Sequence, residues 1–150
     1  MKYEDSMFSV AVFAQLADRK AITLEGAKKA IAAAEAEAKK NNWPVAIAVV
    51  DETGNLIAFQ RLDDTQVASI DIAIGKARTA ARFKRPSKAL EDAVAGGRNV
   101  LLAVNDITPL AGGIPVIVGG RVIGAVGVSG VTSQQDAQVA QAGVTALTPR

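Results

Sequence analysis

The sequence predicts an α+β fold in which a five-stranded antiparallel sheet has helices packed on its faces. Segments with strand character come mostly as neighbouring pairs joined by short turns, rather than alternating one by one with helices. Segments with helical periodicity lie before, between and after these pairs, which is typical of α+β proteins. For 150 residues we expect one domain, with residues 1–22 as an N-terminal extension and a core over about 23–147.

The first predicted elements are a helix and a hairpin. Residues 23–41 have apolar side chains at helical spacing, and Thr23 is a suitable N-cap. Residues 45–51 (VAIAVVD) are typical of a buried strand, and the turn ETGN leads to a return strand over 56–61. The expected buried stripe of the helix is mostly alanine: Leu24, Ala27, Ile31, Ala34 and Ala38.

The middle of the chain is predicted to hold two helices and a further strand. Residues 66–83 have helical periodicity and end at Arg85-Pro86, and Ser87 can cap a short helix to about residue 95. After the two glycines that follow, residues 99–104 (NVLLAV) are apolar and β-branched enough for a strand. The expected buried stripe of the longer helix is Val67, Ile70, Ile74, Ala77 and Ala81.

The clearest hairpin signal is GGIPVIVGGRVIGAVGVSG, residues 112–130. Residues 114–118 and 122–128 are rich in β-branched side chains, which favours strands. Gly119 and Gly120 separate them, and this pair suits a two-residue turn that needs positive φ at both positions. We therefore expect two antiparallel strands here.

A helix over about 133–147 is predicted to follow this hairpin. Thr132 and Gln135 have the spacing of a capping box, which marks a helix start. A strand end that leads into a helix N-terminus is a place where backbone amides can meet a ligand. The expected buried stripe is Ala140, Gly143, Val144 and Leu147.

The composition excludes several kinds of chemistry. The chain has no cysteine and no histidine, which rules out disulfides, thiolate nucleophiles, Cys/His zinc sites, imidazole catalysis and histidine ligation of haem iron. One Trp, one Tyr and four Phe offer little base stacking, and a net charge of +2 gives little attraction to phosphates. We expect no metal site and no nucleic-acid partner.

The sequence also indicates where in the cell the protein is located. No run of the sequence approaches the ~20 apolar residues of a membrane span. The fairly apolar residues 7–17 follow two acidic residues rather than a basic region, which argues against a secretory signal. We therefore expect a cytoplasmic protein with no membrane partner.

Four stretches of the chain carry a family resemblance: VAIAVVDETGNLIAFQRLDD, IGKARTAARFKRPS, GGIPVIVGGRVIGAVGVSG and QQDAQVAQAGV. Together they resemble the family of GlcG, HbpS and the C-terminal domain of PduO, often labelled haem-degrading, over about residues 22–147. The resemblance implies a profilin-like fold, with a five-stranded antiparallel sheet between helices, and a homo-oligomer. It also implies haem or a corrinoid as a ligand. Without histidine, Tyr3, Met7 and the lysines are left as side chains for haem iron, and the sequence does not choose among them.

Four candidate ligand-binding residues lie around the start of the last helix. Ser129, Gly130 and Thr132 offer amides and hydroxyls that can capture a carboxylate or another small anion, or they serve only to cap the helix. Asp136 lies in the first helical turn, where a carboxylate interacts favourably with the helix dipole. Its match to the QD of the family suggests instead that it faces a pocket.

Four further candidates come from elsewhere in the chain. Arg61 either pairs with Asp63 at the surface or places its guanidinium on a ligand carboxylate. Lys76 lies next to a buried stripe, where it either extends to solvent or acts as a desolvated base or anion contact. Gly112 and Gly113 either bring the backbone close to a ligand or permit a bend. We expect Arg61 and Lys76 to converge on the start of the last helix.

Three functions remain open on these residues. The first is a non-enzymatic, homo-oligomeric binding protein that holds a small anionic metabolite or a tetrapyrrole. The second is an enzyme of small-molecule catabolism, an isomerase, hydrolase or lyase, with Lys76 as general base and Arg61 orienting a carboxylated substrate. The third is an accessory or structural subunit of a metabolic enzyme.

Overall fold

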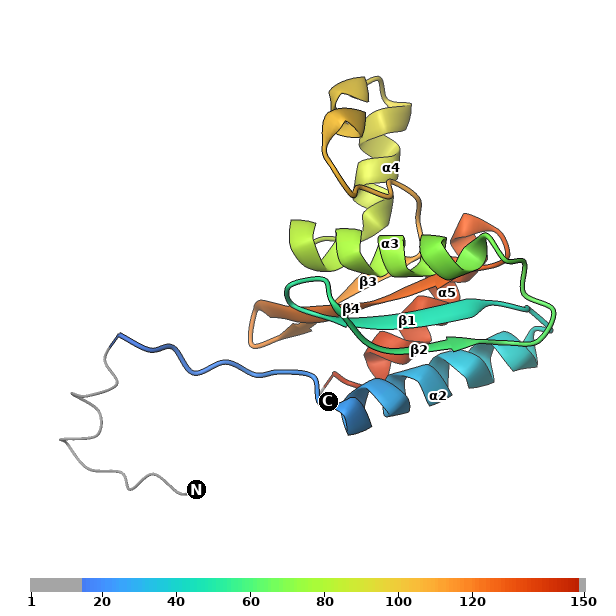
Figure 1. Cartoon of the computed structure of the whole chain (residues 1–150), viewed down its shortest axis with the longest axis horizontal. Helices are drawn as coiled ribbons and strands as arrows, with labels where there is room; N and C mark the ends of the chain where they lie inside the picture. The colour runs from blue at the N-terminus through green and yellow to red at the C-terminus, as the bar shows by residue number, and fades with distance from the viewer. Residues whose placement is uncertain (1–14, 149–150) are drawn as a thin grey trace.

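The computed structural model describes residues 15–148, so that Tyr3 and Met7 lie outside the described residues (Figure 1). Within residues 15–148, none of the helices has the length and apolar character needed to cross a bilayer. In chain order the elements are α2 (Leu24–Lys40), β1 (Ala46–Asp51), β2 (Leu56–Arg61), α3 (Ser69–Phe83), α4 (Ser87–Ala95), the 3₁₀ helix η1 (Asn99–Ala103), β3 (Gly113–Val118), β4 (Arg121–Ser129) and α5 (Ser133–Thr145).

The strands form one antiparallel sheet in the order β2-β1-β4-β3. Helix α3 covers one face, and α2 and α5 cover the other (Figure 1). Ala46 pairs with both Arg61 and Ser129, so the end of β2, the start of β1 and the end of β4 lie side by side. Helix α4 and η1 project away from the sheet beyond α3 (Figure 1).

The sheet has four strands in the described residues, and the prediction of a fifth was wrong. The predicted strand 99–104 is instead η1 and its C-cap. Its backbone is satisfied locally, because the amide of Leu101 bonds to the carbonyl of Arg98 and the amide of Val104 to that of Leu101. The apolar, β-branched composition favours a strand, but this segment lies on the projecting arm and reaches no sheet edge.

The local turn and capping signals were confirmed. Gly119 and Gly120 have φ values of 57° and 75°, as a two-residue hairpin turn requires. The hydroxyl of Thr23 accepts a hydrogen bond from the amide of Gly26 at 3.0 Å. Thr132 and Gln135 form the full capping box at the start of α5. These features depend only on residues close in sequence.

The prediction for the second long helix needs two corrections. Helix α3 begins at Ser69, so Val67 precedes it and is 74% exposed instead of buried. Ser87 does not cap α4, because its hydroxyl donates to the carbonyl of Leu110 at 2.6 Å and accepts from the amide of Gly113 at 2.8 Å. A tertiary contact has replaced the local one.

Small residues let α3 lie close to the sheet. The face of α3 that packs on β4 carries Ala73 and Ala77, both fully buried. Opposite them is Gly127, where an added Cβ would lie 2.7 Å from the Ala77 Cβ and would collide with the carbonyl of Ala73. Lys76 lies between Ala73 and Ala77 in the sequence, and its Nζ reaches the carbonyl of Val128, next to Gly127 on β4.

The close approach predicts a marked loss of stability in Gly127→Ala. We expect its free energy of unfolding to fall by about 3 kcal/mol, because α3 must move away from β4. The matched variant Gly26→Ala lies in the first turn of α2, where a Cβ meets only ordinary contacts at 3.4 Å or more, and should gain about 0.5 kcal/mol. Urea unfolding measures both, and equal effects would contradict the packing argument.

Candidate functional site

The structure places the eight predicted site residues in two separate parts of the molecule. Arg61 ends the edge strand β2, is exposed, and lies about 10 Å from Ser129 by the usual spacing of two strands. Lys76, by contrast, is buried beneath the end of β4. The structure therefore does not bring Arg61 and Lys76 together at one ligand.

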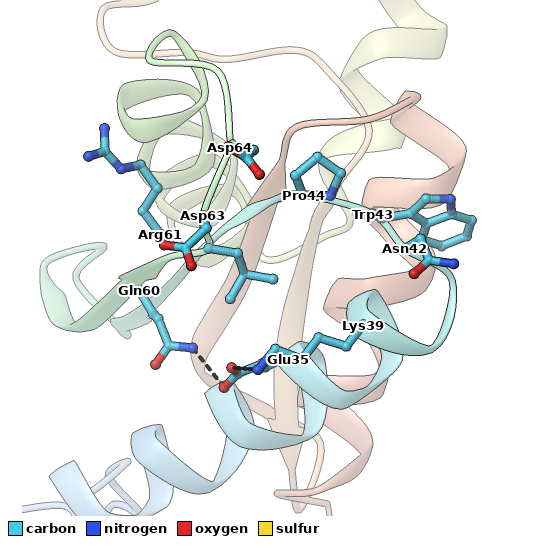
Figure 2. Close-up of a pocket in the computed structure, with 10 residues that line it drawn as sticks. Glu35, Lys39, Asn42, Trp43, Pro44, Gln60, Arg61, Asp63 and Asp64 are labelled. Atoms are coloured by element: carbon cyan, nitrogen blue, oxygen red, sulfur yellow. Dashed lines mark hydrogen bonds and ion pairs between the residues drawn. The ribbon is translucent and has the colours of Figure 1, made fainter.

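Arg61 lies beside a cleft of about 550 Å³ between the C-terminal end of α2 and the segment after β2 (Figure 2). Trp43, Pro44 and Leu62 supply its apolar wall. In Figure 2 the guanidinium of Arg61 points away from Trp43 and from Lys39. The remaining lining residues are polar or charged: Glu35, Lys39, Asn42, Gln60, Asp63 and Asp64.

One ion pair lines the α2 side of this cleft. The Nζ of Lys39 lies 2.7 Å from Oε1 of Glu35, and the side-chain amide of Gln60 donates to Oε2 of Glu35 at 2.8 Å. The hydrogen bonds from Lys39 and Gln60 hold the pKa of Glu35 below its ordinary value. The hydrogen bond and charge of Glu35 raise the pKa of Lys39. Both groups are therefore charged at neutral pH and largely neutralise each other.

The other charged groups of the cleft are unpaired. Among residues 15–148, no ion pair involves Arg61, Asp63 or Asp64, so the surface pair considered for Arg61 and Asp63 is not formed. Asp64 has a φ of 66°, a region that few non-glycine residues adopt. The unpaired charges around the cleft are therefore two carboxylates and one guanidinium.

The sequence singled out Arg61 and Asp63 here but missed Trp43, Lys39 and Asp64. The predicted hairpin already implies that the loop before β1 lies beside the loop after β2, because Ala46 pairs with Arg61. The sequence does not indicate that the C-terminal end of α2 completes the cleft. One signal was present: the single tryptophan of the chain stands in a polar loop, NNWP, rather than in an apolar stripe.

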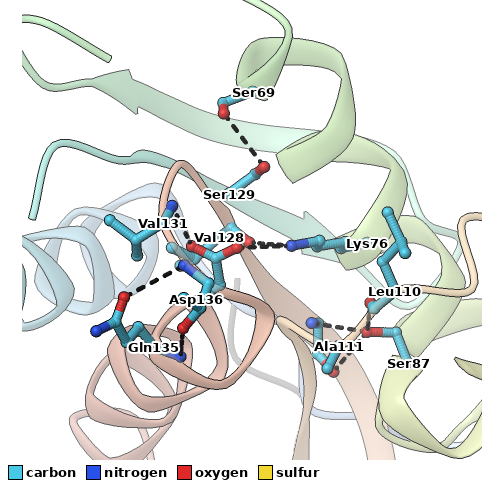
Figure 3. Close-up of polar contacts among 12 residues, drawn as sticks. Ser69, Lys76, Ser87, Leu110, Ala111, Val128, Ser129, Val131, Gln135 and Asp136 are labelled. Atoms are coloured by element: carbon cyan, nitrogen blue, oxygen red, sulfur yellow. Dashed lines mark hydrogen bonds and ion pairs between the residues drawn. The ribbon is translucent and has the colours of Figure 1, made fainter. Parts of the chain in front are cut away.

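The second part of the predicted site is a buried ion pair (Figure 3). The Nζ of Lys76, on α3, donates to Oδ2 of Asp136, on α5, at 2.9 Å and to the carbonyl of Val128 at 3.1 Å. Lys76 is 2% exposed and Asp136 is 1% exposed. The other carboxylate oxygen, Oδ1, accepts from the amide of Val131 at 3.1 Å. Lys76 thus does not extend to solvent.

The pKa of Asp136 is raised above its ordinary value. Burial is the main cause, because it disfavours the charged carboxylate. The hydrogen bond and charge of Lys76, and the amide of Val131, act in the opposite direction. Asp136 has two roles: it is the buried partner of Lys76, and it lies in the first turn of α5, where the sequence placed it.

The two predicted glycines at the start of β3 give Lys76 its room. Gly112 has a φ of 131°, and an added Cβ would lie 2.8 Å from the Nζ of Lys76. At Gly113 a Cβ would collide with the backbone carbonyl of Lys76. Both glycines bring the backbone close, as one reading of the sequence expected, but they approach a lysine of the same chain instead of a ligand.

The three predicted residues before α5 also make contacts within the chain. The Ser129 hydroxyl donates to that of Ser69 at 3.2 Å and is buried. Gly130 has a φ of 152°, and a Cβ there would collide with the carbonyl of Pro44. Thr132 is exposed and caps α5. Their hydrogen bonds are thus used in building the fold.

The chemistry of this buried cluster is limited by its closure. The ammonium of Lys76 has its charge matched by Asp136 and is out of reach of solvent. A general base needs to be within hydrogen-bond reach of a substrate proton, directly or through one water. The buried pair contacts groups of its own chain, whereas the cleft beside Trp43 is open to solvent.

The fold and these two sites define a small α+β domain with a closed polar pair and an open cleft. The family model described as "Haem degrading protein HbpS-like" matches residues 22–145. The chain therefore belongs to the HbpS-like family, which confirms the resemblance inferred from the sequence.

Relatives of known name agree with this assignment. Protein GlcG of Escherichia coli strain K12 is 49% identical over 99 residues, which cover 66% of this chain and 74% of GlcG. The crystal structure of HbpS, a protein of Streptomyces reticuli, superposes with a TM-score of 0.83 at 34% identity, covering 89% of this chain and 95% of that one. A crystal structure of a PduOC–haem complex superposes with a TM-score of 0.77 at 28% identity, covering 85% and 95%.

The described residues do not fit haem held through an iron–protein bond. Haem iron is usually ligated by His, Cys, Met or Tyr, and residues 15–148 contain none of these. The amine of Lys39 at the cleft is kept protonated by Glu35, so its lone pair is not free for iron. Residues 15–148 also hold no group of three or more acidic side chains placed to bind a metal ion.

The buried pair predicts a large stability loss when one partner is removed. We expect Lys76→Met to lower the free energy of unfolding by about 3–5 kcal/mol, because it leaves the Asp136 carboxylate buried without its partner. The double variant Lys76→Met with Asp136→Leu should recover much of this loss, since it buries no charge. Urea unfolding measures both.

A matched control exists on α4. Lys88→Met breaks the Lys88–Asp92 pair, whose N–O distance of 2.8 Å is similar but whose side chains are 58% and 60% exposed. We expect this variant to leave the free energy of unfolding nearly unchanged, because water screens an exposed pair. A Lys76→Met variant as stable as Lys88→Met would show that the buried pair has no structural role.

Proposed function

We propose that this chain is a non-catalytic, homo-oligomeric binding protein whose ligand lies in the cleft beside Trp43. The observation that carries the proposal is the cleft itself. Its volume of about 550 Å³ falls in the range of roughly 300–1,000 Å³ typical of small-molecule sites. Its lining is more polar than that of most small-molecule sites, because only Trp43, Pro44 and Leu62 are apolar, and this favours a ligand that carries polar or charged groups. The cytoplasmic location expected from the sequence stays a prediction.

The proposed ligand is a tetrapyrrole or a small carboxylated metabolite. The indole of Trp43, with Pro44 and Leu62, offers an apolar wall against which a planar body can pack. Rotation about the side-chain bonds of Arg61 brings its unpaired guanidinium to the mouth of the cleft, where it can receive a carboxylate. Asp64 opposes such a ligand by charge repulsion. The haem carried by the PduOC relative supports the tetrapyrrole as the first ligand to test.

A tetrapyrrole would be held here through its ring and its carboxylates. The described residues supply no customary iron ligand, so the metal contributes nothing to affinity unless Tyr3 or Met7 provides one. Haem and metal-free protoporphyrin should then bind equally well. Tighter binding of haem that is lost in Tyr3→Phe or Met7→Leu would place an iron ligand in the N-terminal residues.

The proposal is tested by titrating the protein with metal-free protoporphyrin, haem and short carboxylates while recording tryptophan fluorescence. Trp43 is the only tryptophan, so its emission reports on the cleft alone. We expect saturable quenching, and a rise in melting temperature that grows with ligand concentration. Free N-acetyltryptophanamide corrects for absorption by the porphyrin. The absence of both signals for every ligand at high excess would refute the proposal.

Substitutions of charged residues at the cleft should change the affinity for a carboxylated ligand in opposite directions. Arg61→Gln should weaken binding of a carboxylated ligand about fivefold, because an exposed charge contact contributes about 1 kcal/mol. Asp64→Asn should strengthen it about threefold by removing a repelling charge. Arg121→Gln is the matched control, since Arg121 is an exposed arginine at the opposite end of the sheet. Equal effects of the two arginine variants would mean that binding reflects only net charge.

A further inference from the structure

The turn between β1 and β2, residues 52–55, lies against the C-terminal half of α3 (Figure 1). Two arginines of α3 hold this turn. The Nε of Arg78 donates to the carbonyl of Gly54 at 3.2 Å, and the Nε of Arg82 donates to the carbonyl of Thr53 at 2.8 Å. Two guanidinium groups are therefore fixed in place by the carbonyls of consecutive residues.

Gly54 leaves the room that this arrangement needs. It is buried, its φ is 85°, and an added Cβ would lie 2.7 Å from the Nε of Arg82 and 2.9 Å from the Cγ of Arg78. Residues four apart on a helix are neighbours on its surface, with Cβ atoms about 5–6 Å apart. The two arginine side chains therefore lie next to each other, and their terminal Nη groups are the donors that the turn does not use.

These guanidinium groups lack a counter-ion in the part of the chain that the structure describes. There, no ion pair involves Arg78 or Arg82, and no hydrogen bond involves their Nη atoms. The two carboxylates beside the turn are engaged elsewhere. Oδ1 of Asp51 accepts hydrogen bonds from within the turn, and Glu52 pairs with Arg19 at 3.3 Å. Two like charges thus stand side by side, which is unfavourable on a helix.

The surrounding sequence adds to this positive charge. Residues 72–90 hold six lysines and arginines and no acidic residue. Two of the six, Lys76 and Lys88, have carboxylate partners. The remaining four form no ion pair within residues 15–148: Arg78, Arg82, Lys84 and Arg85. The excess is local, because the net charge of the whole chain is only +2.

We propose that the terminal amino groups of Arg78 and Arg82 form a binding site for a phosphate group. A guanidinium presents a planar fork of N–H donors that matches two oxygens of a phosphate. A carboxylate has only two oxygens, and one fork satisfies them. A phosphate has further oxygens and can accept from both forks at once. Its negative charge also removes the repulsion between the two neighbouring arginines.

This site is separate from the cleft of the proposed function. The cleft lies where Ala46 pairs with Arg61, whereas the turn lies at the other end of the same hairpin. Each strand of the hairpin has six residues, so the two sites are roughly 20 Å apart. A phosphate at the turn does not contact Trp43, and both sites can be occupied together.

The first test measures the affinity of the full-length protein for pyrophosphate, inorganic phosphate and acetate by isothermal titration calorimetry. We expect pyrophosphate to bind most tightly and acetate about tenfold more weakly, because only the phosphates offer oxygens to both arginines. Equal affinities for acetate and pyrophosphate, or no binding of either phosphate, would overturn the proposal. Phenyl phosphate then distinguishes two sources: its binding assigns the site to phosphate esters, and its failure to bind assigns the site to the free anions.

The second test locates the site with single variants. Arg78→Gln and Arg82→Gln should each weaken pyrophosphate binding about fivefold or more, because each removes one charged contact. Arg98→Gln is the matched control, since Arg98 is exposed and has no ion pair within residues 15–148 but lies on the projecting arm. Its affinity should stay within about twofold of that of the unmodified protein, because salt screens a distant charge.

The same variants separate binding from a purely structural role. If the arginines only hold the turn, Arg78→Gln and Arg82→Gln lower the melting temperature and leave the affinity for pyrophosphate unchanged, and the proposal falls. A loss of pyrophosphate binding in Arg61→Gln but not in Arg78→Gln would place the anion at the cleft and would also overturn it.

The third test changes the geometry without changing any charge. In Gly54→Ala the new Cβ displaces both arginines from the turn, so we expect about threefold weaker pyrophosphate binding through lost preorganisation. Gly120→Ala is the control: Gly120 also lies in a hairpin turn, with a φ of 75°, but a Cβ there meets nothing within 4 Å. Equal affinities in the two variants would contradict the anchored pair. If Gly54→Ala does not fold, the arginine variants decide the question by themselves.

Discussion

The ion pair between Lys76 and Asp136 is the interaction on which the arrangement of the molecule depends. Its two members come from helices on opposite faces of the sheet, and they meet just past the end of β4. Buried charges are tolerated only when they are paired and hydrogen-bonded. The carbonyl of Val128 and the amide of Val131 meet this need, which constrains how the chain passes from β4 into α5. Gly112 leaves the space that the ammonium occupies.

The same ion pair bears on where the proposed ligand can lie. A lysine whose charge is neutralised inside the core attracts no anion, so the residues around it support the fold. We therefore place the proposed binding site among groups at the periphery. Arg61 and Trp43 border a cleft that is open to solvent, and η1 presents apolar side chains that the body leaves uncovered. Membership of the HbpS-like family fits a ligand-binding role, although the described residues differ from a haem site in having no customary iron ligand.

Several of the confirmed predictions rested on neighbouring residues. Thr23 and Thr132 cap helices, and Gly119-Gly120 makes the turn, because a hydroxyl or a missing Cβ acts on a backbone only a few residues away. The candidate site was predicted less well. Lys76 and Asp136 were both selected, but their pairing was not, since they are 60 residues apart. The cleft was largely missed, because one of its walls is the end of α2, whose packing against the β1–β2 hairpin is a tertiary contact.

The sequence by itself determined the α+β class, both hairpins, the helix starts with local caps and the exclusion of histidine and thiolate chemistry, because these follow from side-chain type and short-range spacing. Only the tertiary structure decided the rest. Residues 99–104 have strand composition but became η1, since the chain carries them onto an arm away from any sheet edge. Ser87 could cap a helix but binds Leu110 and Gly113 instead. In each case the burial and hydrogen bonds available in three dimensions outweighed a local preference of about 1 kcal/mol or less.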